Sequence, residues 1–170
     1  MADIARRLAR WRVPLGYIIG IIAFWLADPT PDSLVAGMAI ASIGEALRIW
    51  AAGHLEKGRE VTRTGPYAFT RHPLYVGSAL MGAGFIVAAR SSVVAGIVFV
   101  YFAVTVTAAV LSEEAHLVDK FGETYPAYRA GRSTGAQRRF SLERAMRNRE
   151  YRAVVGFVAV LALLAARLAL

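Results

Sequence analysis

Five apolar stretches constrain the fold of this 170-residue chain more than any other feature. They cover residues 13–27, 34–52, 74–89, 93–111 and 153–170. A helix of about twenty mainly apolar residues crosses the hydrocarbon core of a bilayer, and each stretch reaches or approaches that length. Because 56% of the residues are hydrophobic and only 19% are charged, an ordinary soluble domain could not bury so much apolar surface. The sequence predicts a single-domain, all-α polytopic membrane bundle with about five transmembrane helices.

The distribution of Lys and Arg predicts how this bundle lies in the membrane. Seventeen of the 20 basic residues precede the first apolar stretch or fall within residues 53–73 and 120–152. Cytoplasmic loops of membrane proteins carry such an excess of positive charge. The N-terminus and the polar segments 53–73 and 112–130 are therefore expected on the cytoplasmic side, in a bacterial inner membrane, with the C-terminus outside.

Several kinds of site find no support in the composition. Cysteine is absent, and His54, His72 and His116 lie too far apart to form a metal-binding spacing, so no metal site is predicted. Much of the net charge of +8 lies in residues 129–152, which show no pattern of aromatic residues of the kind that stacks on bases. We therefore expect no nucleic acid partner. This basic segment is predicted to be an exposed linker or a helix that binds anionic lipids.

Local signals predict where several helices begin. Prolines within residues 28–33 end the first span, and Ser33 or Asp32 can cap the second. Glycines at positions 77, 82 and 84 of the third span allow close approach by another helix or by a ligand. After the fourth span, Ser112 can cap a new or continuing helix, whose amphipathic part covers residues 115–128.

Two charges lie within the second apolar stretch. Glu45 and Arg48 are three residues apart and therefore neighbours on one helical face. Charges at this depth are costly unless they pair or face a polar cavity, which favours a site inside the bundle. The alternative is a structural ion pair near the helix end, with the Arg48 side chain extending to the lipid headgroups.

The two polar segments predicted on the same side carry the residues best suited to chemistry. Arg71 and His72 follow the Gly-Pro-Tyr turn at 65–67, and Glu113 and Glu114 follow the fourth span. Histidine and carboxylates are the usual proton carriers in general acid–base catalysis. The same residues could equally bind a charged ligand. From the residues alone both interpretations remain open.

The motifs themselves point further. The sequence Gly-Pro-Tyr at 65–67, Arg-His-Pro-Leu-Tyr-Val-Gly at 71–77, and Glu-Glu-x-x-Leu at 113–117 with its continuation to Tyr128, resembles the isoprenylcysteine carboxyl methyltransferase family and the related phospholipid methyltransferases. Residues 44–55 are similar to bacterial members of the same group. The resemblance implies an integral membrane enzyme that uses S-adenosylmethionine and has no Rossmann-like fold.

Site residues also follow from the resemblance. The positions that would line the cofactor are Val61, Thr62, Tyr67, His72, Pro73, Leu74, Tyr75 and Glu113. We expect catalytic roles for Arg71, which would orient an acidic acceptor or the cofactor carboxylate, and for Glu114, which would shape the acceptor side. The methyl acceptor is expected to be lipophilic, for example an isoprenoid-linked carboxylate or an amine lipid.

This chain departs from the family pattern in two places. Ala109 stands where eukaryotic enzymes have an Arg for substrate recognition, and residues 129–135 replace an Arg-Val-Pro type run. These differences favour an acceptor other than a prenylcysteine. Two alternatives stay open: an NADPH-dependent enzyme resembling the sterol reductases, although their Trp-rich passage is missing, and a non-catalytic membrane protein that binds lipids.

Overall fold

The computed structural model describes residues 2–131 and 138–168, and the side chains from residue 14 onward. Its described residues form seven α-helices and one 3₁₀-helix, without a β-strand. The helices are α1 (Ala2–Leu26), α2 (Pro31–His54), η1 (Gly65–Ala68), α3 (Pro73–Ala89), α4 (Ser92–Phe121), α5 (Thr124–Arg129), α6 (Leu142–Arg147) and α7 (Tyr151–Arg167). The predicted all-helical fold is thereby confirmed.

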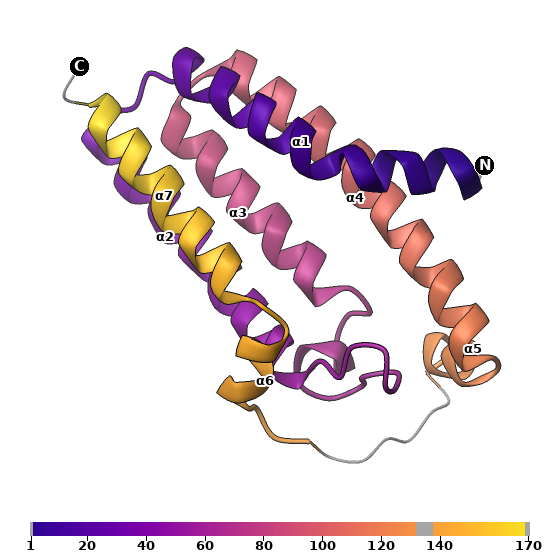
Figure 1. The fold of residues 1–170 in the computed structure, drawn as a ribbon. Helices are drawn as coiled ribbons and strands as arrows, with labels where there is room; N and C mark the ends of the chain where they lie inside the picture. The colour runs from indigo at the N-terminus through magenta and orange to yellow at the C-terminus, as the bar shows by residue number, and fades with distance from the viewer. Residues whose placement is uncertain (1, 132–137, 169–170) are drawn as a thin grey trace.

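The long helices form two groups. Helix α1 lies along α4, while α2 packs against α3 and α7 follows α2 (Figure 1). The short helices α5 and α6 and the polar segment between α2 and α3 gather at one end of the molecule. The C-terminal end of α7 and the α3–α4 turn lie at the other end. The two polar segments are therefore at the same end, as the sequence predicted.

Two of the described helices are long and apolar enough to cross a membrane. These are α2, with 24 residues, and α4, with 30. Helix α3 and the apolar part of α1, Pro14–Leu26, are shorter. Each of the five predicted spans coincides with a helix except at its ends: Ala27 and Leu168 lie outside the helices, and residues 169–170 lie outside the described part of the chain. The count of five membrane crossings and the cytoplasmic N-terminus stay predictions.

The beginning of α2 differs by a few residues from the prediction. Thr30, rather than Ser33 or Asp32, is the N-cap residue. Its hydroxyl accepts a hydrogen bond from the Ser33 backbone N–H at 3.2 Å, and the Ser33 hydroxyl accepts one from the Thr30 backbone N–H at 2.9 Å. Because Pro31 lacks an N–H and has a helical φ, it fits the first helical position and moves the start of the helix forward.

Glycine brings α2 and α3 into backbone contact. A Cβ atom on Gly84 would lie 2.5 Å from the Gly37 carbonyl oxygen, and one on Gly44 would lie 2.6 Å from the Gly77 carbonyl oxygen. Real Cβ atoms do not approach backbone so closely, so neither position has room for a side chain. The predicted close approach of the third span is thus to another helix, and it fixes the His72–Pro73 end of α3 beside α2.

Helix α4 does not end with its apolar stretch. It continues past Ser112 without a break and ends at Phe121, where Gly122 takes a positive φ of 49°. Ser112 is therefore no helix cap, and Glu113 and Glu114 lie on a helix rather than at the start of one. The predicted amphipathic helix at 115–128 is divided at Gly122 between α4 and α5.

Candidate functional site

A cavity of about 1860 Å³ extends from the polar end of the molecule into the bundle. Its walls come from α1, α2, α3, α4, α5 and α7 and from the segment that connects α2 to α3. Nine of the ten predicted site residues line it: Val61, Thr62, Tyr67, Arg71, His72, Pro73, Leu74, Tyr75 and Glu113. The structure brings these residues together around one space, while their individual roles remain predictions.

The deeper part of the cavity is apolar. Helices α1, α4 and α7 contribute side chains such as Phe24, Val98, Phe102 and Leu163. This apolar part is continuous with the polar end, where Glu113 and His72 contribute to the wall. One space therefore offers both a polar binding region and room for a hydrocarbon chain.

Glu114 differs from the other predicted residues because it is absent from the described cavity lining. Its Oε1 lies 3.0 Å from an Arg71 guanidinium nitrogen and 3.1 Å from His72 Nε2, and it accepts a hydrogen bond from the Tyr125 hydroxyl at 3.2 Å. Arg129 lies 3.9 Å from Oε2. Burial raises the pKa of Glu114, but His72 and Arg71 outweigh burial and hold this pKa below its usual range. Glu114 is therefore an anion, and its charge holds Arg71 and His72 in place.

Three tyrosines join the two polar segments. The Tyr128 hydroxyl donates a hydrogen bond of 2.6 Å to the Tyr67 carbonyl oxygen, which ties α5 to η1. Burial, together with the nearby Glu113 charge, raises the pKa of Tyr67. Burial, together with the Glu114 charge, raises the pKa of Tyr125 to about 12. Both phenols are thus neutral at physiological pH, so the Tyr67 ring presents a neutral aromatic surface to the cavity.

Glu113 faces the cavity from α4 and is solvent-exposed. The Tyr67 and Tyr75 rings border the same space. A carboxylate beside aromatic faces attracts organic cations through its charge and through the ring quadrupoles. This side of the polar end is therefore suited to a cationic group, while Arg71 and Lys120 on the same lining suit an anionic one.

Arg48 resolves the question raised by the charges of α2. Its Nε lies 2.8 Å from Glu150 Oε1 and 3.9 Å from Glu45 Oε2. One of its terminal nitrogens donates to the Leu74 carbonyl oxygen at 3.3 Å, and another hydrogen bond joins it to Ser78 Oγ. Arg48 also lines the cavity. Arg48 therefore belongs to an internal ion pair beside the cavity and does not extend to the headgroups as the structural alternative had it, since its side chain is only 19% exposed.

Sequence reasoning did not identify Glu150. This buried residue lines the cavity and pairs with Arg48. It lies near the end of the basic segment and just before the last apolar stretch, so its position resembles an ordinary helix start. No local spacing connects it to Arg48, because the two residues come from distant parts of the chain.

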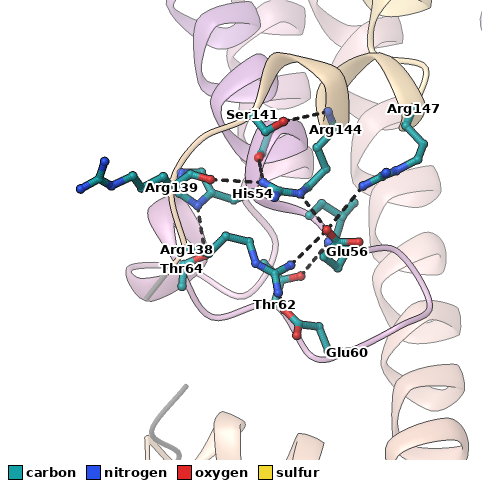
Figure 2. Close-up of polar contacts among 12 residues, drawn as sticks. His54, Glu56, Glu60, Thr62, Thr64, Arg138, Arg139, Ser141, Arg144 and Arg147 are labelled. Carbon is teal, nitrogen blue, oxygen red and sulfur yellow. Dashed lines mark hydrogen bonds and ion pairs between the residues drawn. The ribbon is translucent and has the colours of Figure 1, made fainter. Parts of the chain in front are cut away.

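The basic segment folds back on the polar segment after α2 (Figure 2). Arg144 Nε lies 2.8 Å from Glu56 Oε1, Arg138 lies 3.2 Å from the same oxygen, and Arg147 lies 3.4 Å from it. Arg138 also reaches Glu60 at 2.9 Å. This part of the predicted 129–152 segment is therefore packed on the protein, not a free linker. Residues 132–137 lie outside the described residues, and lipid binding stays a prediction.

Comparison with known proteins decides the family. The family model for phospholipid methyltransferase matches residues 15–124. The chain belongs to the phospholipid methyltransferase family. The match includes the 65–77 motif and Glu113–Glu114, which confirms the resemblance found in the sequence. With the apolar helices, membership in the phospholipid methyltransferase family indicates a membrane methyltransferase.

Two curated relatives are named for metal resistance. The chain is 28% identical to the cobalt-zinc-cadmium resistance protein CzcN of Cupriavidus metallidurans over 127 residues, 69% of this chain and 57% of the relative. It is 29% identical to the nickel-cobalt-cadmium resistance protein NccN of Alcaligenes xylosoxydans xylosoxydans over 124 residues, 67% of this chain and 56% of the relative. The chain thus spans a little over half the length of these relatives. No solved structure matches it.

Proposed function

We propose that this member of the phospholipid methyltransferase family is an integral membrane enzyme that transfers a methyl group from S-adenosylmethionine to a lipophilic acceptor. The observation that carries the proposal is the single cavity in which nine predicted site residues meet an apolar interior. The polar end suits the charged cofactor, and the apolar interior suits the hydrocarbon part of an acceptor that enters from the bilayer.

The residues present at the polar end fit the cofactor. Its sulfonium and ammonium groups are cations, which the Glu113 carboxylate can neutralise and the Tyr67 and Tyr75 rings can contact. Pro73 and Leu74, at the start of α3, line the same region, and backbone groups there would be suited to bond the adenine. His72 is a cofactor contact in this proposal and not an acid–base catalyst.

The cofactor, when bound, supplies an activated methyl group. What this chain has to contribute is alignment of the two reactants and exclusion of water. Arg71 is suited to orient an acidic group of the acceptor or of the cofactor, because Glu114 fixes its guanidinium at 3.0 Å. Glu114 would shape the acceptor side indirectly, because it holds Arg71 and His72 in place.

The acceptor is proposed as a lipid-like molecule with a nucleophilic headgroup, such as an isoprenoid-linked carboxylate or an amine lipid. Its chain would lie against α1, α4 and α7, whose side chains make the deep part of the cavity apolar. We further propose that the site faces the cytoplasm from a bacterial inner membrane, and that exposed arginines of the basic segment, such as Arg149 and Arg152, contact anionic lipids.

Binding and labelling experiments test the proposal. Calorimetry on the purified protein in lipid nanodiscs should show binding of S-adenosylmethionine and S-adenosylhomocysteine, and methyl-labelled cofactor with a total lipid extract should yield a labelled lipid. Glu113→Ala should weaken cofactor binding, and Arg71→Ala should lower turnover. Binding of NADPH without binding of S-adenosylhomocysteine would support the reductase alternative. Binding of neither cofactor would support the non-catalytic one.

A further inference from the structure

The wall of the cavity at its polar end depends on a part of the chain that the family match does not cover. Residues 55–62, which follow α2, contribute Leu55, Glu56, Val61 and Thr62 to the lining. This wall has no regular secondary structure. Its conformation therefore has to be fixed by contacts with other segments, and the contacts come from residues 138–148, beyond the matched residues 15–124.

The first set of contacts is electrostatic. Arg138, Arg144 and Arg147 all lie within 3.4 Å of Glu56 Oε1, and Arg138 also binds Glu60 at 2.9 Å. The side chains of Glu56 and Arg144 are only 14% and 15% exposed. Water screens such a pair less than it screens a surface ion pair, so removal of one partner leaves a poorly solvated charge. Glu56 is thus held firmly where it borders the cavity.

The second set of contacts holds the end of α2. The last carbonyl groups of a helix lack partners within the helix. Here Arg144 donates to the Gly53 carbonyl oxygen, and Asn148 donates to those of Ala52 and Leu55 at 2.9 and 2.8 Å. The Ser141 backbone N–H also donates to the Gly53 oxygen at 3.1 Å. The position at which the chain leaves α2 is therefore fixed by the same segment.

The two sets of contacts act on the predicted cofactor residues through one further bond. The Glu56 backbone N–H donates to the Thr62 hydroxyl at 3.1 Å. This bond closes the turn between the two residues, and Val61 lies next to Thr62 on the cavity wall. A shift of Glu56 would therefore move Thr62 and Val61 as well.

We infer that residues 138–148 form a positioning clamp that fixes the 55–62 wall, so that Arg144 and Glu56 set the affinity for the cofactor without touching the reacting atoms. The inference rests on the proposed function for the identity of the ligand. It assigns to a segment outside the family match a role in shaping the site, and it predicts that this role extends beyond fold stability.

Spin-label distances test the clamp without any ligand. Because the chain has no cysteine, Arg59→Cys on the wall segment and Glu143→Cys on α6 provide two exposed labelling sites. In the otherwise unchanged protein, pulsed EPR in nanodiscs should give a narrow distance distribution. Glu56→Gln or Arg144→Gln should broaden it. Arg139→Gln is the matched control, since it removes the same charge from the same segment while the side chain points away from the cluster in Figure 2.

Affinity measurements on the same variants, without labels, test the consequence. The dissociation constant for S-adenosylhomocysteine should rise about tenfold in Glu56→Gln and in Arg144→Gln. It should rise less in Arg147→Gln, whose side chain is 50% exposed, and stay within about twofold in Arg139→Gln. The KM for the acceptor should change little at temperatures where the variants are fully folded, a selectivity that a general loss of stability would not give.

The outcomes separate the clamp from the proposed function. Broadened distances with unchanged cofactor affinity would overturn the clamp and leave the function standing. Unchanged distances in Glu56→Gln and Arg144→Gln would overturn it regardless of ligand. If the unmodified protein binds no S-adenosylhomocysteine, the proposed function fails and the ligand assignment fails with it, while the EPR series still decides whether the wall is fixed by this segment. If both Gln variants unfold, Arg147→Gln supplies the same test with a smaller expected change in distances and affinity.

Discussion

Glu114 connects more elements of the site than any other predicted site residue whose contacts are described above. Through one carboxylate it joins Arg71 and His72, which precede α3, to Tyr125 on α5. Charge-assisted hydrogen bonds of this kind are shorter and stronger than neutral ones. The position of Arg71 and His72 at the cavity therefore depends on a residue that does not itself border the cavity.

Replacement of Glu114 by Gln tests this dependence. The amide keeps the shape of the side chain but loses the negative charge that holds Arg71. Because Arg71 is then less well aligned, we expect the stabilisation of the transition state to fall by about 2 kcal/mol. If the proposed function is right, turnover should fall about thirtyfold. Asp119→Asn, an exposed change on the same helix, is the control and should leave turnover unaffected. Normal turnover in Glu114→Gln would contradict the supporting role.

The lowered pKa of Glu114 predicts how stability changes with pH. A carboxylate whose folded-state pKa is below its ordinary value of 4.5 stabilises the fold above that value, and the stabilisation is lost as the pH falls through the folded-state pKa. In detergent, the difference in melting temperature between the unmodified protein and Glu114→Gln should therefore stay constant above about pH 5. The difference should shrink in more acidic buffer. A difference in melting temperature that widens on acidification would contradict a lowered pKa of Glu114.

Single residues also show how far the sequence could predict the site. The motifs predicted that Arg71, His72 and Glu113 would share one space, because the basic loops placed both segments on the same side. Glu56 and Glu150 could not be found in this way. Their partners are arginines roughly ninety to one hundred residues away, and only the packing of α6 and α7 against α2 brings them together.

At the scale of elements, the contact between α2 and α3 predicts a contrast between two glycines. Gly84→Ala would place a Cβ 2.5 Å from a backbone oxygen of α2. We expect this overpacking to lower the free energy of unfolding by about 1–3 kcal/mol. Gly96→Ala on α4 meets nothing within 4 Å and should be neutral or slightly stabilising, since Ala favours helix by about 1 kcal/mol. Thermal unfolding of both variants measures the difference. Equal melting temperatures would argue against a backbone contact between the helices.

Helix positions followed the apolar stretches closely, whereas helix ends did not. The stretch 93–111 predicted α4, but the helix continues ten residues beyond it, because Ser112, Glu113 and Glu114 are compatible with helix once the preceding turns are formed. Gly122 ends it, since a positive φ suits glycine best. Hydropathy indicates which part of a helix is apolar, but it does not predict where the backbone hydrogen bonds of the helix end.

For the whole molecule, the charge distribution predicts a definite orientation that labelling can test. In intact cells, a membrane-impermeant maleimide should modify Arg90→Cys, in the turn between α3 and α4, because this end is predicted to be outside. Lys57→Cys, at the polar end, should react only after the membrane is permeabilised. Because the natural chain has no cysteine, any labelling of the protein comes from the introduced cysteine alone. Labelling of Lys57→Cys in intact cells would invert the predicted topology.

The length of α4 has a consequence for which acceptors the enzyme could accept. Thirty helical residues extend about 45 Å, whereas the hydrocarbon core of a bilayer is about 30 Å thick. Unless α4 is strongly tilted, its last turns, with Glu113 and Glu114, stand in the headgroup layer. If the proposed function is right, the length of α4 sets the height of the reacting centre above the acyl chains. Discrimination among acceptors would depend on the number of bonds between nucleophile and hydrocarbon tail, more than on the chemical identity of the tail.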